Sequence, residues 1–157
     1  MKLADLVQEE GVILDFAARD KWEAIEKLVD RLVARKRVKG TLRKAMLDAL
    51  VRRENIASTG MDHGVALPHA QVDGIDEAVV AIGLTRTGIP FQSSDGQPAR
   101  ITVLLLIPKK RVQQHIRTLA GIARLLNYEE MREQLLNAKT EREVVSIIRE
   151  EEAKEFA

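Results

Sequence analysis

With 157 residues, 45% of them hydrophobic and 31% charged, the chain has the size and composition of one folded domain (1–157), which excludes a disordered or fibrous protein. Its 25 Lys and Arg against 24 Asp and Glu leave a formal net charge of +1, so no broad electric field favours nucleic acid or an anionic membrane. The lack of Cys excludes disulfides and cysteine nucleophiles, and the lack of a signal pattern or a bilayer-length apolar run predicts no membrane insertion and a cytoplasmic location.

The first expected elements are a short strand and a capped helix. Val12–Phe16 is an apolar run after Gly11 and predicts a strand. Asp20 stands three residues before Glu23, which is the arrangement of a helix N-cap with its reciprocal partner. Apolar residues then recur at helical spacing and predict one buried face: Trp22, Ile25, Leu28, Val29, Leu32 and Val33. Trp22 is expected to anchor the core.

A second helix and a turn-rich loop follow. Thr41 is expected to cap a helix that continues to about Arg53, with Arg52 beside it at the C-terminal end. The stretch 58–70 interrupts the helical spacing and predicts a loop around a short extended segment. Its turn-forming residues are Gly60, Gly64 and Pro68.

Two apolar segments in the middle of the chain are expected to be strands. Val79–Leu84 and Ile101–Ile107 are too short for typical helices and rich in β-branched or aliphatic residues. The second is apolar enough to be buried on both faces of a sheet. Between them, Ser94–Pro98 has the composition of a turn.

The last third of the chain is expected to be helical. Helical spacing runs over 112–126 and again over 129–136, and Thr140 with Glu143 repeats the capping signature before a last helix. The charged tail 150–157 is expected to fray. Helices alternating with short strands predict an α/β or α+β sandwich.

The chemistry points to histidine. Of three histidines, His63 and His69 both lie in the turn-rich loop. A neutral imidazole attacks phosphorus near pH 7 and gives a labile P–N bond, which suits a phosphoryl carrier. Nearby glycines let backbone N–H groups approach phosphoryl oxygens, and Arg53 offers a planar set of donors. Spacing alone does not bring Arg53 to His69, so a surface histidine remains the alternative.

The same loop permits a metal site as another alternative. His63 and His69, with Asp62 or His115 as a third ligand, have suitable ligand chemistry. The lack of Cys and the basic Arg53 nearby disfavour that reading, so neither a metal nor an organic cofactor is expected.

Several motifs in order carry a resemblance to a known family. They are Arg53-Glu54, Ser58-Thr59-Gly60, Gly64-Val65-Ala66-Leu67-Pro68-His69, Asp95-Gly96-Gln97-Pro98 before an apolar strand closed by Pro108, and His115-Ile116-Arg117-Thr118-Leu119-Ala120. Together they resemble enzyme IIA of the bacterial phosphoenolpyruvate phosphotransferase system, in its fructose, mannitol and nitrogen-regulatory class. The resemblance covers nearly the whole chain.

The resemblance implies both a fold and roles for residues. The implied fold is a mixed β-sheet flanked by helices. His69 would be the phosphoryl acceptor, Arg53 the partner that steadies the phosphoryl oxygens, and His115 a second histidine near the first. Further loop residues that would contribute are Thr59, Gly60, His63 and Gly64, although His63 is favoured as a bystander and a purely packed role for His115 stays open.

The implied function has two versions. In the first, an HPr-like phosphocarrier protein phosphorylates His69, which passes the group to a cysteine of enzyme IIB for sugar uptake. In the second, the chain is a nitrogen-regulatory type protein whose phosphorylation state controls binding to transporters or sensor kinases. A degenerate member that no longer accepts phosphate is a third possibility.

Some features depart from the family pattern or stand outside it. Asp62 occupies a position where glycine is common, and Gln71 one where a basic residue is common. Both changes would weaken attraction to a phosphorylated donor or alter the choice of partner. Two basic clusters, Arg35–Arg37 and Lys109–Arg111, are expected at solvent-facing helix ends or turns. The second is close enough in sequence to His115 to steer an acidic or phosphorylated partner.

Overall fold

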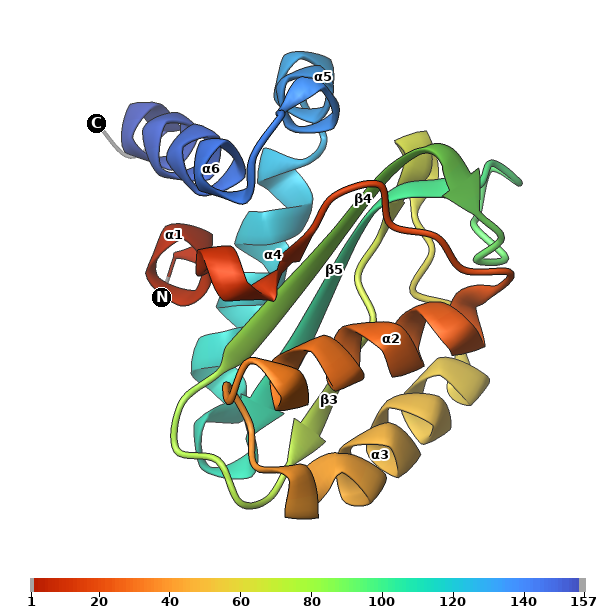
Figure 1. The fold of residues 1–157 in the computed structure, drawn as a ribbon, viewed down its shortest axis with the longest axis vertical. Helices are drawn as coiled ribbons and strands as arrows, with labels where there is room; N and C mark the ends of the chain where they lie inside the picture. The colour runs from red at the N-terminus through yellow and green to blue at the C-terminus, as the bar shows by residue number, and fades with distance from the viewer. Residues whose placement is uncertain (1, 156–157) are drawn as a thin grey trace.

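The computed structural model describes residues 2–155 and shows a five-stranded mixed sheet with helices on both faces (Figure 1). The helices are α1 (Leu3–Leu6), α2 (Lys21–Ala34), α3 (Arg43–Ile56), α4 (Val112–Leu125), α5 (Glu129–Asn137) and α6 (Glu141–Glu155). The strands are β1 (Val12–Ile13), β2 (Val65–Ala66), β3 (His69–Val72), β4 (Val79–Ile89) and β5 (Ala99–Pro108). Short 3₁₀ turns occupy Glu9–Gly11, Gly40–Leu42, Asp62–Gly64 and Lys109–Arg111. The expected sandwich with a mixed, helix-flanked sheet is confirmed.

The sheet is built around the antiparallel pair β4 and β5. β1 pairs in parallel with β4 on one side, and β2 and β3 both pair in parallel with β5 on the other. The two short strands therefore form one edge of the sheet, one after the other. His69 opens β3 and lies opposite Leu105 of β5.

β5 divides the core into two apolar layers, because successive side chains of a strand point to opposite faces. Ile101, Val103 and Leu105 face the layer covered by α1, α4, α5 and α6. Leu104 and Leu106 face the layer covered by α2 and α3, which lie side by side in Figure 1. The expected burial of this strand on both faces is confirmed.

The first long helix begins where its sequence signature predicts. The Asp20 side chain accepts a hydrogen bond from the backbone N–H of Glu23 at 2.9 Å. The expectation that Trp22 anchors the core is wrong, because 38% of this residue is exposed. The buried stripe of α2 centres on Ala24 and Leu28, and Trp22 sits at its edge in the first turn, about 100° around the helix from buried Lys21.

Two boundaries differ from the sequence expectations. Thr41 does not cap α3: it lies inside a 3₁₀ turn, and α3 begins at Arg43 with no side-chain cap. The first strand covers only Val12–Ile13, because β4 offers β1 parallel partners at those two positions alone. The strands expected at Val79–Leu84 and Ile101–Ile107 are confirmed and are longer than expected.

The C-terminal helix is fixed at both ends. Glu143 N–H donates to the Thr140 hydroxyl at 3.1 Å, as the capping signature predicts. α6 continues through the charged tail to Glu155, and the fraying expected for 150–157 stays a prediction; residues 156 and 157 lie outside the described residues. The Glu152 carboxylate is buried and accepts hydrogen bonds from the backbone N–H groups of Leu3 and Ala4 at 2.9 and 2.5 Å. α6 is thereby tied to α1.

None of the helices within residues 2–155 combines the length and the apolar character that a bilayer crossing requires.

Replacing Glu152 with Ala is expected to lower the free energy of unfolding by about 1–3 kcal/mol, because one buried and one half-buried backbone donor lose their acceptor. Chemical denaturation measures the change, and Glu150→Gln, an exposed carboxylate on the same helix, serves as the control. Equal stability of Glu152→Ala and Glu150→Gln would show that the tie between α1 and α6 contributes nothing.

Candidate functional site

His69 occupies a break in the edge of the sheet. Pro68 has no N–H and interrupts the backbone pattern between β2 and β3, while its carbonyl accepts a hydrogen bond from Leu105 N–H at 3.0 Å. The carbonyl oxygen of Leu67 can therefore form a hydrogen bond with the His69 side chain, and it lies 2.7 Å from His69 Nδ1. The half-buried ring is held by its own backbone segment.

This contact fixes which ring nitrogen carries the proton. A carbonyl oxygen only accepts hydrogen bonds, so Nδ1 of His69 must be the donor, and Nε2 of the neutral ring keeps its lone pair. Burial lowers the pKa of His69, and the positive charge of Arg53 lowers it further, while the Leu67 carbonyl and the Glu54 carboxylate act in the opposite direction. The ring is therefore neutral near pH 7, with the lone pair on Nε2.

Arg53 is brought to His69 by the C-terminal turn of α3. One guanidinium nitrogen, Nη1, donates to the carbonyl of Ala57 at 2.8 Å, which orients the side chain at the helix end. Guanidinium carries five N–H donors, so most remain available for a ligand. Although the two residues are 16 positions apart in sequence, Arg53 lies close enough to His69 for its positive charge to lower the pKa of that ring.

A buried ion pair anchors the loop that leads to His69. Glu54 and Lys21, both almost fully buried, form a salt bridge of 3.2 Å between α3 and α2. The same carboxylate accepts the backbone N–H of Thr59 at 2.8 Å and its hydroxyl at 2.6 Å. Sequence reasoning missed Lys21, because a lysine in the first turn of an amphipathic helix is normally solvated. Glu54 was noticed only as part of a motif.

The backbone donors at the start of this loop are already used. Thr59 N–H donates to Glu54, Gly60 N–H to the Ser58 hydroxyl at 3.1 Å, and Met61 N–H to the Val65 carbonyl at 2.7 Å. These three N–H groups therefore hold the shape of the loop, and their expected contribution to phosphoryl binding stays a prediction. Gly60 is needed for packing, since a Cβ there would lie 2.6 Å from the Ser93 hydroxyl.

The turn around His63 is tied to the turn around Asp95. The backbone N–H of exposed His63 donates to Asp95 at 3.0 Å, and the Ser94 hydroxyl donates to Asp62. His63 has a φ of 66° and Gly64 one of 75°, so the chain passes through the left-handed region at both residues. These contacts give His63 and Gly64 a role in loop geometry. The Asp62 carboxylate is engaged in the hydrogen bond from Ser94.

His115 lies on α4, fully buried. Leu105, the register partner of His69, faces the layer that contains α4, so both histidines belong to the same side of the sheet. The structure does not join them by a hydrogen bond, because neither ring nitrogen of His115 has a partner among the described residues. Burial lowers the pKa of His115, with charged Arg111 and Glu77 as neighbours.

Large apolar side chains are exposed where α2 begins and α3 ends. Trp22 is 38% exposed and Ile56 is 79% exposed. The Lys21 ammonium lies 5.0 Å from the centre of the Trp22 ring, and its salt bridge to Glu54 places this end of α2 beside the end of α3. The adjoining ends of α2 and α3 thus form an exposed apolar border, as protein-binding surfaces commonly do.

Within residues 2–155, no three His, Asp or Glu side chains are grouped so as to hold a metal ion. The metal alternative considered for His63 and His69 with Asp62 or His115 has no such cluster to support it.

Comparison with known proteins identifies a consistent set of relatives. The sequence pattern of a family described as "Phosphoenolpyruvate-dependent sugar phosphotransferase system, EIIA 2" matches residues 5–151. The fructose-specific EIIA component of the phosphotransferase system from Haloferax volcanii is 35% identical over 141 residues, which cover 90% of each chain. The fructose-specific EIIABC component from Bacillus subtilis is 31% identical over 148 residues, and the chain spans only 23% of its length.

A solved structure shares the fold closely. The nitrogen regulatory protein IIA-Ntr from Neisseria meningitidis superposes with a TM-score of 0.83 at 25% sequence identity. The match covers 93% of this chain and 98% of that protein.

Replacing Lys21 with Met is expected to lower the free energy of unfolding by about 3–5 kcal/mol, because the Glu54 charge would stay buried without its cation. Glu54→Gln is also destabilising, and the double variant loses less than the sum of the two single changes. Lys44→Met, which breaks the exposed pair with Asp48, leaves stability essentially unchanged. Additive effects in the Lys21 and Glu54 cycle would contradict direct pairing.

His69 is expected to titrate below the ordinary histidine value of about 6.5. The unfolded chain then binds the proton more readily than the folded chain, so stability contributed by neutral His69 is lost as the pH falls from about 6.5 through the folded midpoint. NMR of the ring protons against pH measures that midpoint. Arg53→Gln should raise it, whereas Arg52→Gln should not, and a midpoint above 6.5 would contradict the assigned burial effect.

Proposed function

Because this chain belongs to the EIIA type 2 family of the phosphoenolpyruvate-dependent sugar phosphotransferase system, we propose that it accepts a phosphoryl group on Nε2 of His69 from an HPr-like phosphocarrier protein and passes it to an enzyme IIB cysteine for sugar uptake. The observation that carries the proposal is the hydrogen bond from His69 Nδ1 to the Leu67 carbonyl, since it leaves Nε2 as the free nucleophile. No metal or organic cofactor takes part in this chemistry.

The first transfer is a displacement at phosphorus. The Nε2 lone pair of His69 forms the new P–N bond while the bond between phosphorus and the donor atom breaks, and the donor keeps that electron pair. The proton on Nδ1 stays in place, held by the Leu67 carbonyl. The ring therefore becomes cationic beside an anionic phosphoryl group, and no general base is required.

Arg53 stabilises the charge on the transferred group. Phosphoryl transfer depends mainly on alignment and on neutralising the charge spread over three oxygens, and guanidinium matches those oxygens with planar, permanently charged donors. With the nearby loop N–H groups engaged elsewhere, Arg53 is the side chain we assign to this task. In the second transfer, a thiolate of enzyme IIB attacks phosphorus, the P–N bond breaks, and His69 returns to its neutral form.

The proposal extends to domain, partner and location. We assign the carrier role to residues 1–157 as one domain, in line with the family match over 5–151. The relative named EIIABC supports an enzyme IIB partner, because A, B and C parts are named together there. The chain would meet these partners in the cytoplasm. His115 is assigned to the same site as a positioning residue, on the same side of the sheet as His69.

A second candidate function is regulation by phosphorylation state. The close structural likeness to a nitrogen regulatory protein favours it. A phosphoryl group on His69 would add a charge of roughly −1.5 to −2 beside the exposed apolar border of Trp22 and Ile56. A transporter or sensor kinase that docks on this border would then distinguish the two forms.

Incubation with phosphoenolpyruvate, enzyme I and a matching phosphocarrier is expected to add one acid-labile phosphoryl group, measured by intact mass. The group should be absent from His69→Ala, and ¹⁵N NMR of labelled protein should place phosphorus on Nε2. Labelling that persists in His69→Ala, or phosphorus on Nδ1, would contradict the assignment. Transfer onward to an enzyme IIB cysteine separates the carrier function from regulation alone.

Arg53→Gln is expected to slow phosphorylation of His69 by about 100-fold, as loss of a donor to transition-state charge does elsewhere. Arg53→Lys should recover part of the rate, because the charge returns without the planar geometry. Exposed Arg52→Gln, one residue earlier on α3, is the matched control. Equal rates for Arg53→Gln and Arg52→Gln would remove Arg53 from the site.

A further inference from the structure

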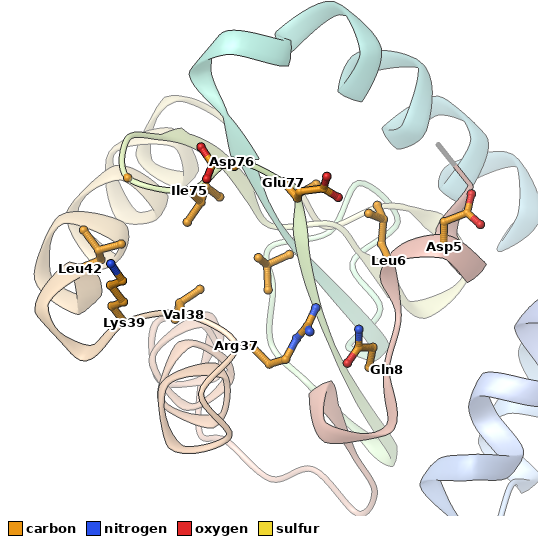
Figure 2. A pocket seen from close by; sticks show the side chains of 13 residues that line it. Asp5, Leu6, Gln8, Arg37, Val38, Lys39, Leu42, Ile75, Asp76 and Glu77 are labelled. Carbon is orange, nitrogen blue, oxygen red and sulfur yellow. The ribbon is translucent and has the colours of Figure 1, made fainter.

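A pocket of about 450 Å³ lies at the other end of β3 from His69, and the functions above make no use of it. Three segments form its walls: the end of α1 with Gln8, the connection between α2 and α3, and the connection from β3 to β4. Figure 2 shows these walls around a common space. A volume of this size is in the range of small-molecule sites.

The pocket holds charges of both signs that are not paired with one another. Arg37 and Lys39 come from the connection between α2 and α3, Asp76 and Glu77 from the connection between β3 and β4, and Asp5 from α1. Among residues 2–155, none of these five side chains forms an ion pair. The cationic and anionic side chains therefore lie on separate walls of the pocket, and each can still form hydrogen bonds to a ligand.

Arg37 is the most specific of these groups. It belongs to the basic cluster Arg35–Arg37, which was expected to face solvent, yet Arg37 is half-buried while Arg35 and Lys36 are exposed. In Figure 2 its guanidinium extends into the space between the walls. A partly desolvated guanidinium with no side-chain partner favours a planar anion such as a carboxylate.

The rest of the lining is aliphatic. Leu6, Val38 and Val79 are buried at the base of the pocket, and Leu42 and Ile75 are partly exposed at its walls. A bound molecule would therefore combine two opposite charges with a branched apolar body. An anion alone would meet three carboxylates, and a cation alone would meet Arg37 and Lys39.

We propose that this pocket binds a small aliphatic zwitterion, an amino acid or a dipeptide. Its carboxylate pairs with Arg37, its ammonium group with Asp76 or Glu77, and its side chain packs on Leu6 and Val38. The site shares no residue with the His69 site, so it stands or falls independently of phosphoryl transfer.

Titration of the full chain with L-leucine, followed by calorimetry and by backbone amide NMR, tests the proposal. Saturable binding is expected, with shifts concentrated at pocket residues such as Leu6, Val38 and Ile75. 4-Methylpentanoate lacks the ammonium group and 3-methylbutylamine lacks the carboxylate, so each should bind at least about tenfold more weakly. Leucyl-leucine, tested alongside, decides between a free amino acid and a dipeptide.

Matched variants assign the two charges. Arg37→Gln and Asp76→Asn/Glu77→Gln should each weaken binding of the better zwitterion about tenfold or more, while exposed Arg35→Gln should leave it unchanged. Unchanged thermal unfolding of the variants shows that they remain folded. The proposal is overturned if neither zwitterion binds, if 4-methylpentanoate or 3-methylbutylamine binds as tightly, or if Arg37→Gln and Arg35→Gln behave alike.

Discussion

The buried carboxylate of Glu54 is the constraint on which the site depends. A charge removed from water must be paired and hydrogen-bonded, and Glu54 meets this requirement with Lys21 from α2 and two donors of Thr59. The Glu54 carboxylate thus joins α2, α3 and the loop at Thr59. Because Arg53 precedes Glu54 on the same helix, the network also sets the position from which Arg53 acts on His69. A buried network of this kind is less tolerant of substitution than an apolar contact, because removing any one partner leaves the other buried polar groups without a hydrogen bond.

The histidine itself needs little further support from side chains. One backbone carbonyl selects its tautomer, and partial burial keeps the ring neutral. The glycines of the neighbouring loop serve mainly geometry: Gly60 allows close approach to Ser93, and Gly64 turns the chain through the left-handed region. The site is therefore assembled from backbone shape plus one arginine, which suits the carrier role proposed above, in which two different proteins reach His69 in turn.

Local patterns in the sequence predicted most of the helices and the two long strands, because amphipathic spacing and capping are properties of neighbouring residues. They could not predict β2 and β3, whose few residues become strands only by pairing with distant β5. His69 and Arg53 were identified through family resemblance, since nothing local places them together. The prediction for Trp22 was wrong and Lys21 was missed for one reason. Residue type predicts a buried indole ring and an exposed ammonium group, whereas the salt bridge to Glu54 buries Lys21 and Trp22 remains partly exposed.

The break at Pro68 has a consequence for the solubility of the protein. Unpaired strand edges are templates for aggregation, and a histidine on a sheet edge, such as His69, would ordinarily lie on such a template. Here the edge is divided into β2, with two residues, and β3, with four, and the opposite edge strand β1 also has only two. β2 and β3 are therefore each too short to offer a long row of donors and acceptors to a second sheet. The edge of the sheet that carries His69 is therefore a poor template for strand-to-strand self-association.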